Sequence, residues 1–286
     1  MKIKKIIKRA FFITVIAVII LAVLVLSFFK IGFELNEYER YTPDASAMLG
    51  EAEMRAILQK DELNEDDYDT LYYQTGLTQI GINSVLKNNG VDGVLEFQKS
   101  YFTSYGIEHD YFAPFCDYMS IDGESPSGKM VELQNGDIII SSSTVFSCWD
   151  VGHCAFVIDA ENGRVLEAVG IGRNSTTNYA VYLRNRPDYI VLRPNIDKET
   201  LDQVVEYAKE NLIDIPYDPT VGVLTRKYDT EIPLTQCAHI IWYAFMQFGY
   251  DIDSNGGFVV SPKNIVHSQY LDIVQVFGFD PDKLWN

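Results

Sequence analysis

The pattern of apolar and polar positions divides the chain into an apolar N-terminal segment and a longer, mixed body. Residues 10–29 form an apolar run that only Thr14 and Ser27 interrupt. At about 1.5 Å per residue in a helix, this run extends roughly 30 Å, the thickness of the hydrocarbon core of a bilayer. Basic residues stand mainly before the run, which favours a cytoplasmic N-terminus. We therefore predict a basic cytoplasmic tail over 1–9 and a transmembrane signal anchor over 10–29, with residues 31–286 outside the cytoplasm.

A cleaved signal peptide is the alternative for this segment. Signal peptides have a shorter apolar region, and small residues mark the site at which they are cleaved. No small-x-small site follows Leu26, so the sequence favours an uncleaved, single-pass anchor in the plasma membrane.

After a spacer over 30–42, the first part of the body shows the helical period of 3.6 residues. Glycine and asparagine residues divide this part into four predicted helices, at 43–60, 68–74, 77–87 and 91–101. Residues 103–129 are rich in Tyr, Phe, Pro, Asp, Ser and Gly and predict a long loop. We therefore expect a helical extension and loop over 43–130, which covers one side of a sheet or serves as a lid or substrate wall.

Beyond this extension the pattern changes to short apolar strands with two longer helices. The predicted strands are 137–141, 154–158, 164–169, 180–183, 189–193 and 271–277. The turn at 159–163 predicts an antiparallel hairpin between the second and third of these strands. Asp197 caps one predicted helix, and a short helix is expected at 262–268. This order predicts the α+β fold class, with an antiparallel sheet, for a domain over 131–286.

The composition indicates a folded and strongly acidic protein. Apolar residues make up 47% of the chain, enough for a substantial core. Residues 1–30 contain six basic residues and no acidic ones, so the remainder carries 17 basic and 40 acidic residues, a formal charge of −23. An acidic body argues against a nucleic-acid partner, which requires a positive surface. It suits cationic substrates, although acidic surfaces often serve only solubility.

The most informative segment is a predicted buried helix with a cysteine near its start. Its apolar face consists of Ile240, Ile241, Ala244, Phe245 and Phe248. Thr235 is the predicted N-cap and Gly249 the stop signal, so Cys237 falls in the first turn. Unpaired backbone N–H groups and the helix dipole favour a negative charge there. The thiol is therefore expected to ionise below its reference pKa of about 8.5 and to act as a nucleophile.

A cysteine nucleophile requires a base, and His153 is the best candidate. It precedes a predicted strand, and the predicted hairpin brings that strand beside Glu167. A carboxylate next to an imidazole orients the ring and stabilises its charged form. Singly, a buried cysteine is commonly inert and a histidine at the start of a strand is commonly structural. Asp150 and Asn178 are the alternatives to Glu167 as the third member.

The sequence predicts no cofactor and no metal site. Gly170-Ile171-Gly172-Arg173-Asn174-Ser175 lacks the third glycine of a dinucleotide-binding loop. Asp251-Ile252-Asp253-Ser254-Asn255-Gly256 matches the first half of a calcium loop, but Pro262 replaces the bidentate glutamate. A turn is therefore favoured there, and the binding of calcium by its Asp and Asn side chains is left open.

The cysteines leave further alternatives. They are Cys116, Cys148, Cys154 and Cys237. An exported protein forms disulfides readily, so a Cys148–Cys154 pair is left open. A zinc site that combines His153, Cys154, Cys237 and His239 is disfavoured. Cys237 and His239 point to different faces of one helix, and the chain contains no C-x-x-C motif.

Several segments form a characteristic series along the chain: Asn135-Gly136-Asp137-Ile138-Ile139, Gly152-His153, Leu166-Glu167-Ala168, Gln236-Cys237 to Phe245, and Phe248-Gly249-Tyr250-Asp251-Ile252-Asp253. Taken in order, they resemble the YiiX/YebB-like branch of the NlpC-type, papain-like cysteine hydrolases, including relatives from Gram-positive bacteria. Outlying similarities, which extend the match over 60–280, are Asp66-Asp67-Tyr68 and Ser261-Pro262-Lys263-Asn264-Ile265. Cys154 departs from the small residue expected after the histidine.

The resemblance implies a circularly permuted papain-like fold, in which the histidine strand precedes the cysteine helix. It also implies Cys237 as nucleophile, His153 as base and Glu167 as the third catalytic residue. Pro216-Tyr217 resembles the proline-tyrosine pair that shapes the substrate groove of NlpC-type enzymes. This tyrosine and Trp149 are the residues expected to bind substrate.

The expected function is that of a membrane-anchored, extracytoplasmic cysteine hydrolase. It would cleave amide bonds in cell-wall peptides through a Cys-His-Glu triad. One alternative is a lipid-directed acyltransferase or lipase on the same permuted fold. Another is a catalytically silent binding module, and the intact triad weighs against it. The expected partners are a peptide or amide substrate and the membrane, and no nucleic acid.

Overall fold

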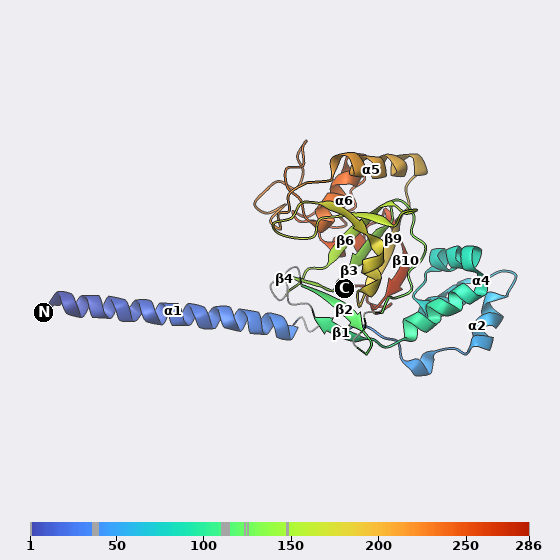
Figure 1. Ribbon diagram of the computed structural model, residues 1–286, viewed down its shortest axis with the longest axis horizontal. Coiled ribbons are helices and arrows are strands. Elements are labelled where there is room, and N and C mark those ends of the chain that lie inside the picture. Colours follow the sequence, from blue (N-terminus) through green and yellow to red (C-terminus); the bar gives the residue numbers. More distant parts are fainter. Residues whose placement is uncertain are drawn as a thin grey trace.

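The computed structural model describes residues 2–35, 40–109, 115–122, 124, 126–146 and 149–285 (Figure 1). These residues form helices and two antiparallel sheets, which confirms the predicted α+β class. The larger sheet has the strand order β10-β9-β3-β6-β7-β8. Its strands are β3 (Ile138–Ser141), β6 (His153–Asp159), β7 (Arg164–Glu167), β8 (Thr176–Tyr179), β9 (Tyr189–Pro194) and β10 (Leu271–Phe277).

Helices bury both faces of the larger sheet, which explains why its central strands are almost continuously apolar. Along β6, Phe156 belongs to the core that includes α5 (Lys198–Asn211) and α6 (Cys237–Met246). Its neighbour Ala155 points to the opposite face and joins the core of the N-terminal helices. Figure 1 shows α5 and α6 on one side of the strands and α2 and α4 on the other.

The N-terminal extension is helical, as predicted, but its first helix is shorter than expected. Its elements are η1 (Ala45–Ala47), α2 (Glu51–Leu58), α3 (Glu65–Thr75) and α4 (Gln79–Phe102). The prediction of one helix over 43–60 is wrong because the chain is extended at Gly50, the N-cap of α2, with φ −65° and ψ 154°. The last two predicted helices form the single element α4, with the expected break at Gly90, whose φ is 68°.

The predicted loop over 103–129 contains strands that the sequence did not reveal. They belong to the smaller sheet, with the order β1-β2-β4-β5. Its strands are β1 (Gly106–His109), β2 (Phe115–Ser120), β4 (Thr144–Phe146) and β5 (Trp149–Asp150). Ile107 is only partly buried and Glu108 is exposed, so β1 has no strong apolar pattern to recognise.

Residues 180–183, predicted as a strand, form a 3₁₀ helix instead, η2 (Ala180–Asn185), directly after β8. Ala180 and Leu183 are both buried. Burial at positions i and i+3 fits three residues per turn, whereas a half-buried strand buries every second side chain. This difference matters for the position of Tyr182, because η2 brings its hydroxyl to the Glu167 carboxylate.

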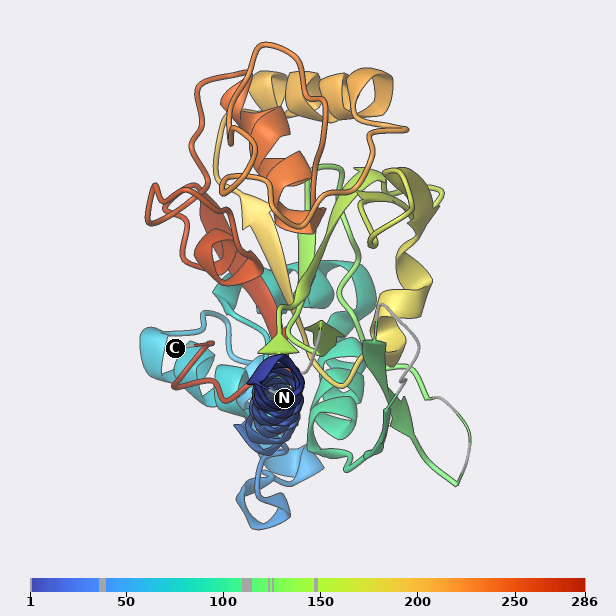
Figure 2. The same ribbon diagram turned by 90° about the vertical axis from the view of Figure 1, so that its left-hand side faces the viewer.

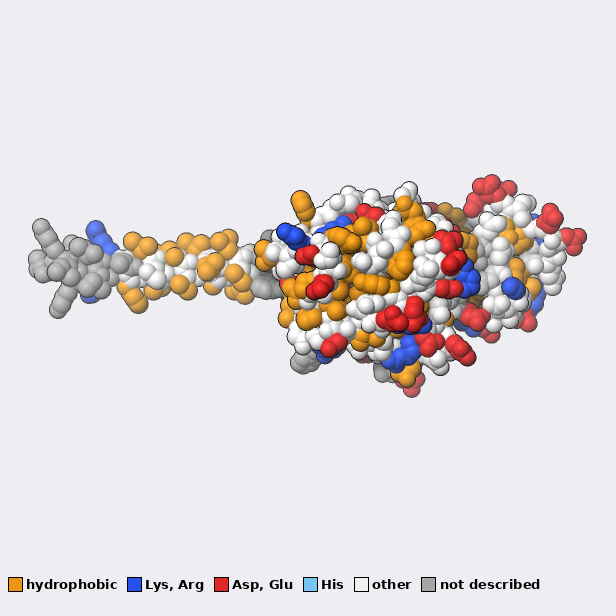
Figure 3. Space-filling view, turned by 90° about the horizontal axis from the view of Figure 1, so that it is seen from above, with side chains coloured by type: hydrophobic (Ala, Val, Ile, Leu, Met, Phe, Trp, Pro, Cys, Tyr) orange, Lys and Arg blue, Asp and Glu red, His pale blue; other side chains and the backbone are white. Residues whose placement is uncertain are grey.

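The N-terminal segment is one helix, α1 (Lys2–Leu35), which extends away from the body; Figure 2 looks along its axis. It continues through the first part of the predicted spacer at 30–42. The side chains at 11–27 are exposed, and Figure 3 shows them as an apolar surface beside a body with many acidic side chains. Among the described residues, no helix is long and apolar enough to cross a bilayer. The anchor over 10–29 therefore stays a prediction.

Candidate active site

Cys237 is the first residue of α6, a position that favours a thiolate. The N-cap is Gln236 and not Thr235, as predicted from the sequence. Gln236 Oε1 accepts a hydrogen bond from the Ala238 backbone N–H at 2.9 Å. Gln236 Nε2 donates to the Val260 carbonyl at 2.6 Å, and this bond orients the amide so that its oxygen faces the helix. The predicted helix is confirmed, with a longer side chain as its cap.

His153 begins β6 and Glu167 ends β7, the two strands of the predicted hairpin. The strands are antiparallel, with Phe156 opposite Leu166, which confirms the hairpin and brings both residues to one end of the sheet. His153 Nε2 and Glu167 Oε2 lie 2.7 Å apart. His153 is 7% exposed and Glu167 is fully buried. The carboxylate thus fixes the imidazole and leaves Nδ1 as the nitrogen free to act on a substrate or thiol.

Three hydrogen bonds stabilise the buried Glu167 carboxylate. Besides His153, Asn178 Nδ2 donates to Oε1 at 2.8 Å, and the Tyr182 hydroxyl donates to Oε2. Burial by itself raises the pKa of Glu167, but the hydrogen bond and charge of His153 and the other two bonds hold it below its usual value. Asn178, an alternative third member, therefore supports Glu167. The side chain of Asp150, the other alternative, lies outside the described residues.

His153 and Cys237 shift each other's pKa in opposite directions. Burial disfavours the charged form of His153, yet hydrogen bonding to Cys237 and to Glu167 raises its pKa to about 10. Hydrogen bonding from Cys154 lowers the pKa of Cys237; burial opposes this, and the hydrogen bond and charge of His153 lower it further, well below its usual value. These shifts favour a thiolate–imidazolium pair at neutral pH, the reactive state of a cysteine nucleophile.

Cys154 is a neighbour of Cys237 to which the sequence assigned no role in catalysis. It lies two residues before Phe156 in β6, so it shares the face of the sheet that packs against α6. Burial, followed by its interaction with Cys237, raises the pKa of Cys154 well above its usual value, and the neutral thiol is a hydrogen-bond donor. Cys154 and Cys237 are both free thiols. Cys148, the partner considered for Cys154, lies outside the described residues.

The candidate site opens into a pocket with a volume of about 460 Å³. Cys237 and His153 line it, and so does Tyr217, which the sequence predicted as a substrate-binding residue. The side chain of Trp149, the other such prediction, lies outside the described residues. Most of the remaining wall is apolar, from Val151, Ala168, Val169, Ile171, Val259, Val260, Pro262 and Trp285. A pocket with apolar walls and a few polar groups is typical of a small-molecule or acyl-group site.

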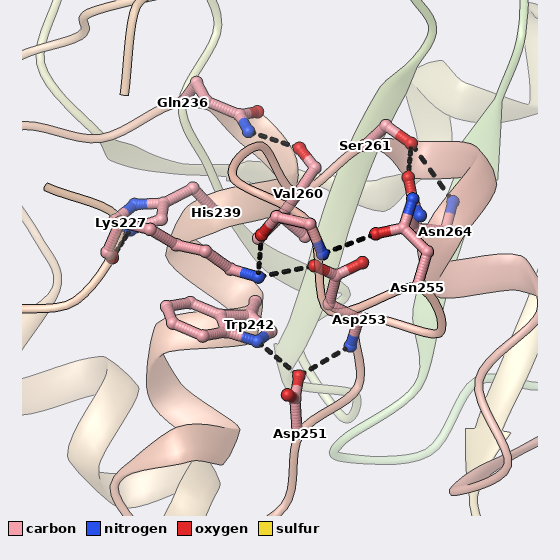
Figure 4. A network of polar contacts seen from close by, with 11 residues as sticks. Lys227, Gln236, His239, Trp242, Asp251, Asp253, Asn255, Val260, Ser261 and Asn264 are labelled. Atoms are coloured by element: carbon pink, nitrogen blue, oxygen red, sulfur yellow. Dashed lines mark hydrogen bonds and ion pairs between the residues drawn. The ribbon is translucent and has the colours of Figure 1, made fainter. Parts of the chain in front are cut away.

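A polar network ties the loop between α6 and α7 (Pro262–Val266) to α6 itself (Figure 4). Lys227 Nζ lies 2.5 Å from Asp253 Oδ2 and 4.6 Å from the centroid of the Trp242 ring. Trp242 Nε1 donates to Asp251 Oδ1 at 2.7 Å. Because this loop continues into the pocket wall, the network fixes that wall relative to α6, the helix that begins at Cys237.

Hydrogen bonds and ion pairs of this network occupy His239, Asp251 and Asp253, which were considered as metal ligands. Both ring nitrogens of His239 are occupied, Nδ1 by the Thr235 hydroxyl at 3.0 Å and Nε2 by the Lys227 carbonyl at 2.7 Å. Burial lowers the pKa of His239 to about 4, so the ring is neutral. Asp251 and Asp253 bind Trp242 and Lys227, respectively. In the part of the chain that the structure describes, no group of three or more His, Cys, Asp or Glu side chains could hold a metal ion.

The geometry suits acyl transfer by a cysteine nucleophile. A thiol with a lowered pKa and an imidazole line one pocket, and a buried carboxylate is hydrogen-bonded to that imidazole. The Cys237 backbone N–H stands in the first helical turn, where N–H groups lack intrahelical acceptors. Such an N–H group is a suitable donor to a developing oxyanion. No family model, curated protein or solved structure matches the chain.

Proposed function

We propose that the protein is a cysteine hydrolase with Cys237 as nucleophile, His153 as general base and acid, and Glu167 as the orienting carboxylate. The observation that carries the proposal is the buried His153–Glu167 pair, 2.7 Å apart, beside a thiol whose pKa is lowered. Burial of charge is costly, and perturbed pKa values that coincide with a pocket are typical of active sites.

The mechanism follows from the position of each group. The Cys237 thiolate adds to the carbonyl carbon of an amide or ester, and the Cys237 backbone N–H stabilises the oxyanion. The His153 imidazolium gives the proton on Nδ1 to the leaving nitrogen or oxygen, and the bond to that atom breaks. Neutral His153 then removes a proton from water as the water attacks the thioester. Collapse of the second tetrahedral intermediate releases the acid and restores the thiolate–imidazolium pair.

We also propose a circularly permuted papain-like fold of the NlpC type for the body. Its support is the chain order, because β6 with His153 precedes α6 with Cys237, and α6 packs on β6. Residues 10–29 are proposed to anchor the body outside the cytoplasm, on the grounds of their length, apolar character and basic flank.

Cell-wall peptides with amide bonds are the substrate that we propose, since a tethered extracytoplasmic body would reach them. A lipid acyl group in ester or amide linkage is the second candidate. The apolar wall of the pocket favours this candidate, because long aliphatic chains require such a surface.

The test is a comparison of the full chain with its Cys237→Ala variant. We expect iodoacetamide to label Cys237 in the unmodified protein, and wall fragments or phospholipid vesicles to release a new amine or a fatty acid. Cys237→Ala should lose both the labelling at this site and the turnover, whereas Lys87→Gln, at an exposed lysine outside the pocket, keeps both. Full turnover in Cys237→Ala would refute the cysteine-hydrolase proposal. Release of fatty acid without any new amine would show that the substrate is the lipid and not the cell-wall peptide.

A further inference from the structure

The charge of the pocket is opposite in sign to that of the body. The chain beyond its first thirty residues carries 40 acidic and 17 basic residues, yet no described Asp or Glu lines the pocket. Apart from His153, the ionisable side chains of its wall with a positive charge are Arg173 and Lys263. A pocket whose described lining has two permanent cations and no carboxylate is unexpected on so acidic a protein.

The two cations come from different parts of the chain, and their backbones are held in place. Arg173 lies between β7 and β8; its N–H donates to the Gly170 carbonyl at 3.2 Å, and its carbonyl accepts from the Tyr217 N–H at 3.1 Å. Lys263 lies in α7, directly after Pro262 and close to the N-cap Ser261. Both side chains are exposed, so each is accessible to a ligand that enters the pocket.

Neither of these cations forms an ion pair with any residue that the structure describes. Elsewhere in the body, many cations are neutralised by a carboxylate within 4.0 Å. Examples are Arg55, Lys60, Lys129, Arg193, Lys198, Lys209, Lys227 and Lys283. The charges of Arg173 and Lys263 are therefore available to a ligand.

We propose that Arg173 and Lys263 bind an anionic group of the substrate, a carboxylate or a phosphate, while its scissile carbonyl lies at Cys237. This inference rests on the proposed hydrolase function and adds the charge of its substrate. Guanidinium and ammonium groups bind carboxylate and phosphate oxygens through charge-assisted hydrogen bonds. Because salt screens charges over about 8 Å at physiological ionic strength, cations in the pocket outweigh acids on distant surfaces.

The inference reverses the expectation that the acidic body selects cationic substrates. Attraction of an amine by the surface at long range is weakened by salt, whereas the described lining of the pocket has cationic, apolar and neutral polar side chains but no Asp or Glu. Arg173 and Lys263 are accordingly specificity-determining residues, and they take no part in the proton transfers of His153.

The kinetic test uses two chromogenic octanoyl esters that differ only by a carboxylate on the nitrophenyl leaving group. The enzyme is the full chain in a non-ionic detergent. We expect the Arg173→Gln/Lys263→Gln double variant to lose about tenfold in kcat/KM for the anionic ester, because an exposed pair between each cation and the carboxylate contributes modestly. For the neutral ester, its kcat/KM should stay within about twofold of that of the unmodified protein. Lys87→Gln, which removes an exposed lysine outside the pocket, should change neither value. Equal loss on both esters, or none, would overturn the inference.

A binding measurement separates this inference from the proposed function. Isothermal titration of the Cys237→Ala variant with octanoate, octyl phosphate, octanamide and octylamine compares four head groups on alkyl chains that differ by at most one methylene. We expect one or both anions to bind more tightly than octanamide, and octylamine to bind least; the order of the two anions distinguishes carboxylate from phosphate. Equal affinity for octanoate, octyl phosphate and octanamide, or no binding of either anion, would overturn the inference. Anion-selective binding without Cys237-dependent turnover of any ester would instead refute the proposed hydrolase function and leave the anion-binding inference in place.

Discussion

Glu167 has no exposed surface, although an isolated carboxylate is among the most costly groups to bury. Its oxygens accept hydrogen bonds from His153, Asn178 and Tyr182, which offset that cost and fix the carboxylate in the ionised state. The sequence indicated Glu167 because the predicted hairpin brings it beside the strand that His153 precedes. It gave no indication of Tyr182, because the burial pattern of a 3₁₀ turn over so few residues is easily mistaken for a strand.

The Glu167→Gln variant tests the orienting role, because it removes the charge and keeps the side-chain volume. We expect kcat to fall by about tenfold or more, as the imidazole loses its orienting partner. The charge of Glu167 raises the pKa of His153, which is about 10, so its loss should lower that pKa and move the alkaline limb of kcat/KM to lower pH. The control is Asn178→Ala, which keeps the charge and should have a smaller effect. Wild-type kinetics in Glu167→Gln would remove Glu167 from the site.

Cys154 is predicted to tune the nucleophile. Hydrogen bonding from Cys154 lowers the pKa of Cys237, so Cys154→Ala should raise that pKa and shift the pH midpoint of iodoacetamide labelling upward. Cys154→Ser, which retains a hydrogen-bond donor, should shift the midpoint less. The measurement is the labelling rate at Cys237 as a function of pH. An identical midpoint in all three proteins would mean that Cys154 has only a packing role.

At the scale of elements, the sequence predicted best the segments whose burial follows a regular period. The hairpin of β6 and β7 and the helix α6 are examples, since their side chains alternate or recur over several turns. It failed in the segment 103–129, where two short strands carry polar and partly exposed residues. Such strands are specified by the partners with which they pair, and those partners lie elsewhere in the chain.

Gln236 links two elements, because it caps α6 and holds the loop that precedes α7. We expect Gln236→Ala to lower the free energy of unfolding by about 1 kcal/mol, the usual contribution of an N-cap, and to raise KM as the pocket wall at Val260 loosens. Asparagine is also a good N-cap but is one methylene shorter, so Gln236→Asn should retain most of the stability and still raise KM. The measurements are urea unfolding and steady-state kinetics. Unchanged unfolding of Gln236→Ala would contradict the capping role.

At the scale of the whole molecule, net charge and site charge are separate properties. The charge of the body could be counted from the sequence, but that of the pocket could not, because the pocket is assembled from distant segments. Arg173 and Lys263 are 90 positions apart by their numbers, and only the fold brings them to one pocket. The order of His153 before Cys237 was readable from the chain, whereas the lack of a described Asp or Glu in the pocket lining depends on which loops converge.

The membrane topology predicted for the whole chain follows from the charges around its apolar run. Five of the six basic residues within residues 1–30 precede the apolar run at 10–29, no acidic residue accompanies them, and such a flank is retained on the cytoplasmic side. Protease added to intact spheroplasts should therefore digest the body and leave a membrane-bound fragment that contains the run. Lysed spheroplasts serve as the control for access to the cytoplasm. A body that resists protease in intact spheroplasts but is digested after lysis would reverse the topology and would place the candidate site among cytoplasmic substrates.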